Sequence, residues 1–120
     1  MADASDPNAL LPLKNSTYRV LLALADESLH GYAIMQSLQT ITGGRESILP
    51  GTLYAALARM EDEGLIERAT APDDDTSGGP ARRYHRRTDF GRAVAEAESE
   101  RIATLLDVAR SQDMLAERAK

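Results

Sequence analysis

Cysteine and tryptophan are absent from the 120-residue chain, and aromatic residues make up only 4% of it. Without cysteine there can be no disulfide framework and no thiolate metal site, and an intracellular location is allowed. With so few aromatic residues, the core must be built from Leu, Ile, Val, Met and Ala. A chain of this length fits a single domain, because domains of roughly 100–150 residues are the commonest.

Long hydrophobic runs are also missing. No stretch approaches the ~20 apolar residues of a membrane-spanning helix. Residues 1–8 are acidic and polar, without the basic region and apolar run of a secretory signal. We therefore expect a soluble, cytoplasmic protein that has no membrane partner.

Catalytic and metal-binding patterns are not present in the sequence. The two histidines, His30 and His85, lie in different predicted elements and lack the spacing of metal ligands. There is no Ser/His/acid motif and no glycine-rich phosphate loop. We therefore expect no enzyme activity, no metal and no cofactor, and we interpret His30 as a residue that caps or packs at the start of a helix.

Positive charge is scarce overall, since 14 Lys and Arg face 19 Asp and Glu for a net charge of −5. It is nevertheless concentrated, because residues 81–92 carry five arginines against Asp89, a local balance of +4 that leaves −9 elsewhere. A basic stripe on an acidic body is compatible with local contact to phosphates. The acidic remainder would repel non-specific DNA.

Apolar residues recur at helical spacing in three successive segments. The first follows a predicted N-cap at Asn15 or Ser16. The second follows His30-Gly31, and the third opens at Pro50, which suits a first helical turn. Residues 1–14, before the first helix, are expected to form a mobile N-terminal arm.

The second half of the chain predicts a hairpin and a long helix. Residues 65–70 and 81–87 are typical of strands, and residues 72–80 between them are rich in Asp, Ser, Thr, Gly and Pro, which favour a loop. Thr88 is the expected N-cap of the last helix. The order of helix, helix, helix, strand, loop, strand and helix is that of a winged helix-turn-helix, but unrelated α+β domains share it.

Three motifs allow a more specific prediction of the protein family. They are His30-Gly31-Tyr32-Ala33-Ile34, then Pro50-Gly51-Thr52-Leu53-Tyr54 followed by Glu63-Gly64-Leu65-Ile66, and last Arg82-Arg83-Tyr84-His85 with Thr88 and Gly91. In this order they resemble the second helix, the recognition helix with the strand after it, and the second wing strand of PadR-family transcription regulators. The resemblance extends over residues 13–109.

The resemblance implies a mainly α (α+β) fold. A winged helix-turn-helix DNA-binding domain would occupy residues 15–88, and a long C-terminal dimerisation helix with its tail would occupy residues 89–120. It also implies a function, that of a homodimeric repressor on a pseudo-palindromic operator, released by a small-molecule inducer. The short C-terminus resembles that of members with a single dimerising helix.

Two residues of the second wing strand depart from the family pattern. Arg87 stands where the family has an aliphatic residue, and His85 stands where it has tyrosine. The two positions share a face of the strand, and this face should pack inward. Arg87 could lay its aliphatic stem on the core and place its charge outside.

The third helix should present its N-terminal residues to base edges in the major groove. With Leu53, Leu57 and Met60 buried, the candidate DNA contacts are Ser47, Thr52, Tyr54, Ala55 and Arg59. Hydroxyl groups can bind a base or a phosphate, alanine can touch a thymine methyl group, and arginine can reach guanine or phosphate. The alternative is an ordinary solvated helix face, and the motif favours DNA. Gly51 costs about 1 kcal/mol relative to alanine in a helix, which close approach by DNA or by a neighbouring helix would explain.

The wing supplies the other candidate DNA contacts, Arg82, Arg83 and Arg86. Guanidinium groups beside a loop tip suit phosphates or a minor groove. The alternative is a charged hairpin in which these arginines pair with the aspartates at 73–75.

The last helix has no later element to pack on, and its apolar residues would form a large exposed patch on a lone helix. A second copy of the chain would cover them. The residues expected at this interface, or in a ligand pocket beside it, are Tyr18, Leu22, Ile102, Leu105, Leu106 and Ala109.

Two rival functions remain open at this point. A winged helix used for protein association, without DNA binding, would agree with the net acidity. A small enzyme would need a cluster of titratable groups that the sequence does not show.

Overall fold

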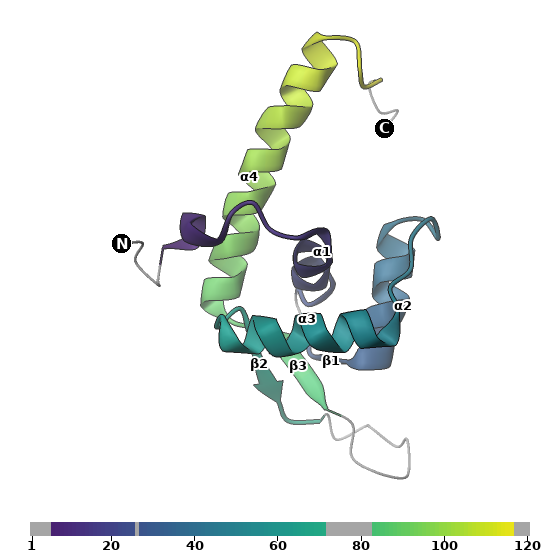
Figure 1. Cartoon of the computed structure of the whole chain (residues 1–120), viewed down its shortest axis with the longest axis vertical. Helices are drawn as coiled ribbons and strands as arrows, with labels where there is room; N and C mark the ends of the chain where they lie inside the picture. Colours follow the sequence, from purple (N-terminus) through teal and green to yellow (C-terminus); the bar gives the residue numbers. More distant parts are fainter. Residues whose placement is uncertain (1–5, 26, 72–82, 117–120) are drawn as a thin grey trace.

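The computed structural model describes residues 6–25, 27–71 and 83–116. The predicted mainly helical fold with a small sheet is confirmed, and two short elements, η1 and β1, are added (Figure 1). The elements are η1 (Pro7–Leu10), α1 (Asn15–Ala23), β1 (Leu29–His30), α2 (Gly31–Ile41), α3 (Pro50–Asp62), β2 (Ile66–Ala69), β3 (Tyr84–Arg87) and α4 (Asp89–Ser111). None of these helices is both long enough and apolar enough to cross a membrane.

The helix starts follow from local hydrogen bonds. The His30 imidazole caps α2, where Nδ1 accepts a hydrogen bond from the Ala33 N–H at 3.2 Å. Thr88 caps α4 through its hydroxyl, which accepts from the Gly91 N–H at 2.9 Å. Both caps agree with the predictions made from the sequence. The first helix differs, because Lys14 is its N-cap residue and makes no side-chain cap bond.

The three strands form one antiparallel sheet in the order β1-β3-β2. β2 and β3 are the wing, paired so that Glu67 faces Arg86 and Arg68 faces His85. β1 pairs with the start of β3, where His30 faces Tyr84. β1 could not be predicted from the sequence, because a strand of two residues is too short to show an alternating pattern. The sheet thereby fixes the wing against the start of α2.

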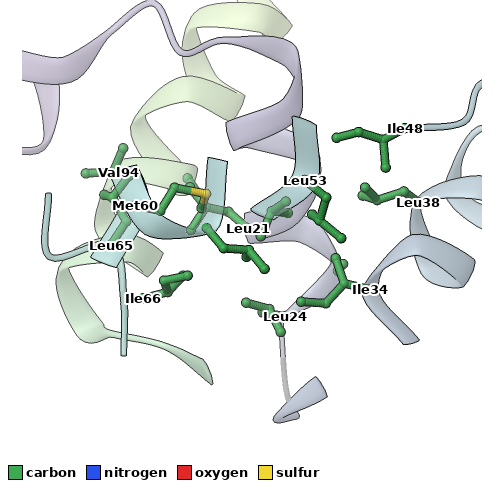
Figure 2. Close-up of a cluster of buried hydrophobic side chains, with 14 residues drawn as sticks. Leu21, Leu24, Ile34, Leu38, Ile48, Leu53, Met60, Leu65, Ile66 and Val94 are labelled. Atoms are coloured by element: carbon green, nitrogen blue, oxygen red, sulfur yellow. The ribbon is translucent and has the colours of Figure 1, made fainter. Parts of the chain in front are cut away.

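The core lies among α1, α2, α3 and the start of α4 (Figure 2). The predicted buried stripe of α3 is confirmed, since Leu53, Leu57 and Met60 are buried together with Ala56. The remaining members are aliphatic, as the scarcity of aromatic residues requires. They come from α1, α2 and α4, from the start of the wing and from the segments beside these elements: Val20, Leu21, Ala23, Leu24, Ile34, Leu38, Ile48, Leu65, Ile66, Val94 and Ala95.

Residues 6–14 are packed against the rest of the protein, whereas the sequence predicts a mobile arm. Leu10, Leu11 and Leu13 pack against the core, and the Leu13 N–H donates a 2.8 Å hydrogen bond to the Glu98 carboxylate on α4. In Figure 1 this segment crosses α4 before it enters α1. Burial of these three leucines and the hydrogen bond to Glu98 both offset the conformational entropy that the segment loses when it packs on α4. Residues 1–5 lie outside the described part.

Candidate nucleic-acid interface

The exposed side of α3 carries three of the residues predicted to contact DNA. Thr52, Tyr54 and Ala55 are exposed, opposite the buried stripe of this helix. Ser47 is exposed in the segment that leads into α3. The structure therefore brings four of the predicted contacts to one end of one helix, with their side chains open to solvent.

The Arg59 side chain does not lie on the exposed side of α3, where the sequence predicts it. Its guanidinium donates a 3.2 Å hydrogen bond to the hydroxyl of the buried Thr17 on α1, and its Nε lies 4.0 Å from a carboxylate oxygen of Glu63. The residue is half-buried at the edge of α3 that faces α1. Helical spacing places residue 59 close to the exposed side, and a long side chain at that edge can turn either way.

Two glycines bear on the shape of this surface. A Cβ at Gly31 would lie 2.9 Å from the Tyr54 hydroxyl, so the lack of a side chain there lets the Tyr54 ring lie against the start of α2. A Cβ at Gly51 would meet nothing within 4 Å. Packing against the described part of this chain therefore does not explain Gly51.

The wing presents arginines beside this helix. Arg83 is exposed in the position immediately before β3. Arg86 is exposed and donates a 2.7 Å hydrogen bond to Glu67 across the strand pair. Arg82 and the aspartates at 73–75 lie outside the described residues.

The two departures of the second wing strand both have a structural explanation. The Arg87 guanidinium donates to the backbone carbonyls of Leu21, at 3.3 Å, and Ala25, at 2.8 Å. It therefore satisfies free carbonyls at the C-terminal end of α1, a common role for arginine. His85 is buried on the inner side of β3. Neither residue is directed to solvent, as their shared inward face predicts.

A cleft of about 480 Å³ separates α3 from the wing. Tyr32, Tyr54, Arg83 and His85 are among the residues that line it. This cleft could not be predicted from the sequence, because the residues that line it come from five different elements. The pairing of Arg68 with His85 across the sheet becomes visible only once the register is known.

Charged groups meet at the inner end of this cleft. The Glu61 carboxylate lies 3.2 Å from the His85 Nδ1 and 3.9 Å from the Arg68 Nε. Burial lowers the pKa of His85 below its ordinary value of 6.5, against the opposing effect of Glu61. The imidazole is therefore neutral near pH 7. In the described part of the chain no group of three acidic or histidine side chains is arranged to hold a metal.

The residues predicted for dimerisation or ligand binding fall into two groups. Tyr18 and Leu22 lie on α1, where the Tyr18 hydroxyl is 2.7 Å from the Ser99 hydroxyl of α4 and Leu22 lines a hollow of about 360 Å³ with residues of α4. Ile102, Leu105, Leu106 and Ala109 lie on the outer half of α4. That half projects away from the other helices (Figure 1).

A model of the transcriptional regulator PadR-like family matches residues 20–97. Two curated relatives are similar over shorter segments. An uncharacterized 37.1 kDa protein in transposon TN4556 of Streptomyces fradiae is 51% identical over 47 residues, which cover 39% of this chain and 13% of that protein. An uncharacterized protein X of Lysinibacillus sphaericus is 34% identical over 74 residues, which cover 62% of this chain and 65% of that protein. The chain thus spans less than two thirds of either relative.

Solved structures share the fold. A PadR family transcription regulator from Clostridium difficile R20291 has a TM-score of 0.69 at 22% identity, with 82% of this chain and 97% of that chain covered. The structure of Bacillus subtilis PadR in complex with operator DNA has a TM-score of 0.58 at 21% identity, with 74% and 47% covered. At these identities the likeness concerns the winged helix architecture.

Proposed function

Because the chain belongs to the PadR-like family of transcriptional regulators, we propose that it is a homodimeric repressor that binds a pseudo-palindromic operator and is released by a small molecule. Members of this family are transcription regulators and not enzymes. The observation that supports the proposal best is the exposed N-terminal part of α3 beside a wing that carries arginines.

The DNA-binding surface in this proposal has two parts. The first part is the N-terminal end of α3 with the segment before it, placed in the major groove. The second is the wing, placed on the adjacent backbone or minor groove. The proposed contacts are Ser47, Thr52, Tyr54 and Ala55 from the first part and Arg82, Arg83 and Arg86 from the second. Arg59 is left out, because its guanidinium is used between α3 and α1.

The proposed dimer rests on one continuous stripe along α4. Gly91, Val94, Ala95 and Glu98 are buried within the described chain. The same helical spacing continues outward through Ile102, Leu105, Leu106 and Ala109, and there Leu105 is 57% exposed. The outer end of the stripe exposes apolar side chains to solvent, and exposed apolar patches mark interaction sites. A two-fold partner would cover these side chains with the same apolar surface. We therefore propose that the outer half of α4 packs against its counterpart in the partner subunit.

A ligand would act on the spacing of the two recognition helices. The hollow lined by Leu22, Ala95 and Ser99 lies where α1 meets α4. Tyr18 is hydrogen-bonded to Ser99 next to it. A small molecule bound there would shift the dimer between DNA-binding and non-binding states only if it binds the two states differently. We propose this region, with the outer part of α4, as the inducer site.

The surface is tested by two substitutions with different expected effects. We expect Arg83→Ala to weaken binding to all sequences and to reduce the slope of log affinity against log salt by about 1, because it removes one phosphate contact. We expect Thr52→Ala to lose discrimination between operator and random DNA. Both are measured by gel shift on DNA upstream of the gene, at several salt concentrations.

Arg110→Ala is the matched control, since Arg110 is an exposed arginine far along α4 that pairs with Asp107. Its salt slope should equal that of the unmodified protein. Unchanged affinity in both Arg83→Ala and Thr52→Ala would refute the assigned surface.

The alternative function is protein association without DNA binding, which the net charge of −5 favours. Salt dependence separates the two functions. A DNA-binding protein loses affinity for DNA steeply as salt is added, because neutralised phosphates release counterions. If no duplex binds at low salt, the alternative is favoured.

A further inference from the structure

The exposed side of α3 offers few groups that can form paired hydrogen bonds with a base. Its exposed residues are Pro50, Gly51, Thr52, Tyr54, Ala55, Ala58 and Asp62. Arginine, lysine, asparagine and glutamine make the two-point contacts that identify guanine or adenine in the major groove. None of these four types is among these exposed residues, and the one arginine of α3, the half-buried Arg59, donates its hydrogen bond to Thr17.

An apolar side chain lies at the N-terminal end of α3, which would enter the major groove in the proposed function. Leu49 is the N-cap residue of this helix, and it is 75% exposed. The residue before it, Ile48, is buried in the core. The backbone therefore turns at this point so that one large aliphatic side chain is buried and the next is directed to solvent. Single exposed leucines are common on protein surfaces, but the N-terminal residues of a recognition helix are those that meet base edges.

We propose that α3 recognises thymine through its C5-methyl groups, with Leu49, Ala55 and the methyl group of Thr52 as the contacting groups. This inference rests on the proposed DNA-binding function. Thymine is the only base that presents a methyl group in the major groove, so apolar contact alone distinguishes it from the other three. The half-sites of the operator accordingly contain thymines under the N-terminal end of α3, and Leu49 is a specificity-determining residue.

The experiment removes one methyl group at a time from the DNA. An operator is first obtained by in vitro selection from random duplexes with the full-length protein. Each half-site thymine is then replaced by deoxyuridine, which keeps the base pairing and the O4 acceptor and loses only the methyl group. We expect affinity to fall about fourfold at each contacted position, which corresponds to the ~0.8 kcal/mol of one buried methyl-sized group. Deoxyuridine outside the half-sites should change nothing.

Leu49→Ala identifies the side chain that makes the contact. This variant should bind the thymine operator several-fold more weakly, and it should become insensitive to deoxyuridine at one position. Because Leu49 is exposed, its thermal melting should be unchanged. Ile41→Ala is the control, since Ile41 is an exposed aliphatic residue at the C-terminal end of α2. It should keep both the affinity and the deoxyuridine effect.

The outcomes separate the inference from the function on which it rests. If selection enriches no duplex, the proposed DNA-binding function fails. If an operator is enriched but deoxyuridine has no effect at any half-site position, the reading of methyl groups is overturned while the function stands. If deoxyuridine has an effect that persists in Leu49→Ala, the assignment of Leu49 is overturned.

Discussion

His85 shows how one buried imidazole connects the wing to the helix that we propose to bind DNA. It lies on the inner side of β3, close to Glu61 of α3 and opposite Arg68 of β2. Burial and the two cations Arg68 and Arg83 favour its neutral form, while Glu61 favours its charged form. Burial has the largest effect, so the pKa of His85 is lowered and the folded protein disfavours protonation.

The stability of the fold should therefore depend on pH through His85. A lowered pKa means that the unfolded chain binds the proton more tightly, so the contribution is complete above pH 6.5 and is lost as pH falls from there through the folded-state pKa. We expect a loss of up to about 1.4 kcal/mol per pH unit in this range. Urea unfolding between pH 8 and pH 5 measures it. His85→Gln should flatten the profile, whereas stability that rises on acidification would mean that Glu61 outweighs burial.

Elements differ in how far the sequence determines them. The starts of α2 and α4 could be predicted, because His30 and Thr88 cap them through contacts within three residues. The strand β1 could not, since its two residues become a strand only by pairing with β3, more than 50 positions later.

The candidate site, like the fold, could be predicted only in part from the sequence. The exposed positions of α3 follow from helical periodicity, which reports the side of a helix. Periodicity does not indicate the direction that a long side chain takes. The contact of Arg59 with Thr17, in place of a position on the exposed face, could therefore not be predicted. The cleft beside His85 depends on strand register, which the sequence did not fix. Arg87 was correctly predicted to lie inward, but its acceptors at the end of α1 required the tertiary structure.

The N-terminal segment is an element whose attachment depends on one buried carboxylate. Glu98 is 1% exposed, accepts the Leu13 N–H, and is held by the Arg101 guanidinium one turn further along α4. The hydrogen bond from Arg101 lowers the pKa of Glu98, so the carboxylate stays charged. The leucines of the segment and this carboxylate together fix residues 6–14 against α4.

Removal of this carboxylate should loosen the segment. Glu98→Ala leaves the Leu13 N–H without its acceptor, and we expect a loss of about 1–3 kcal/mol in unfolding free energy. Limited proteolysis should cleave before residue 15 sooner than in the unmodified protein. Glu100→Ala, two residues away and exposed, is the control and should change neither measurement. Equal protease resistance in both variants would show that the leucines alone hold the segment.

At the scale of the whole molecule, the acidic charge lies mostly outside the arginine-rich strand of the proposed DNA-binding surface. Residues 81–92 carry a balance of +4 and the rest of the chain carries −9. Within the described residues, several acidic side chains are already paired with cations, among them Glu61 with Arg68 and Glu67 with Arg86. In the proposed function, an acidic body disfavours binding at arbitrary sequences, and the placement of two recognition helices on one operator would then supply most of the affinity.

The proposed placement depends on the proposed dimer, and a charge in the stripe of α4 should abolish both. We expect Leu105→Glu to elute as a monomer at micromolar concentration in size-exclusion chromatography with light scattering, while its helical circular dichroism is retained. Thr104→Glu adds the same charge on the opposite side of α4, and it should remain dimeric. Because two linked half-sites bind 10²–10⁴ times more tightly than one, the Leu105→Glu variant should lose about that factor in operator affinity. An unmodified protein that is monomeric under these conditions would rule out the proposed dimer, and the exposed stripe would then need another partner.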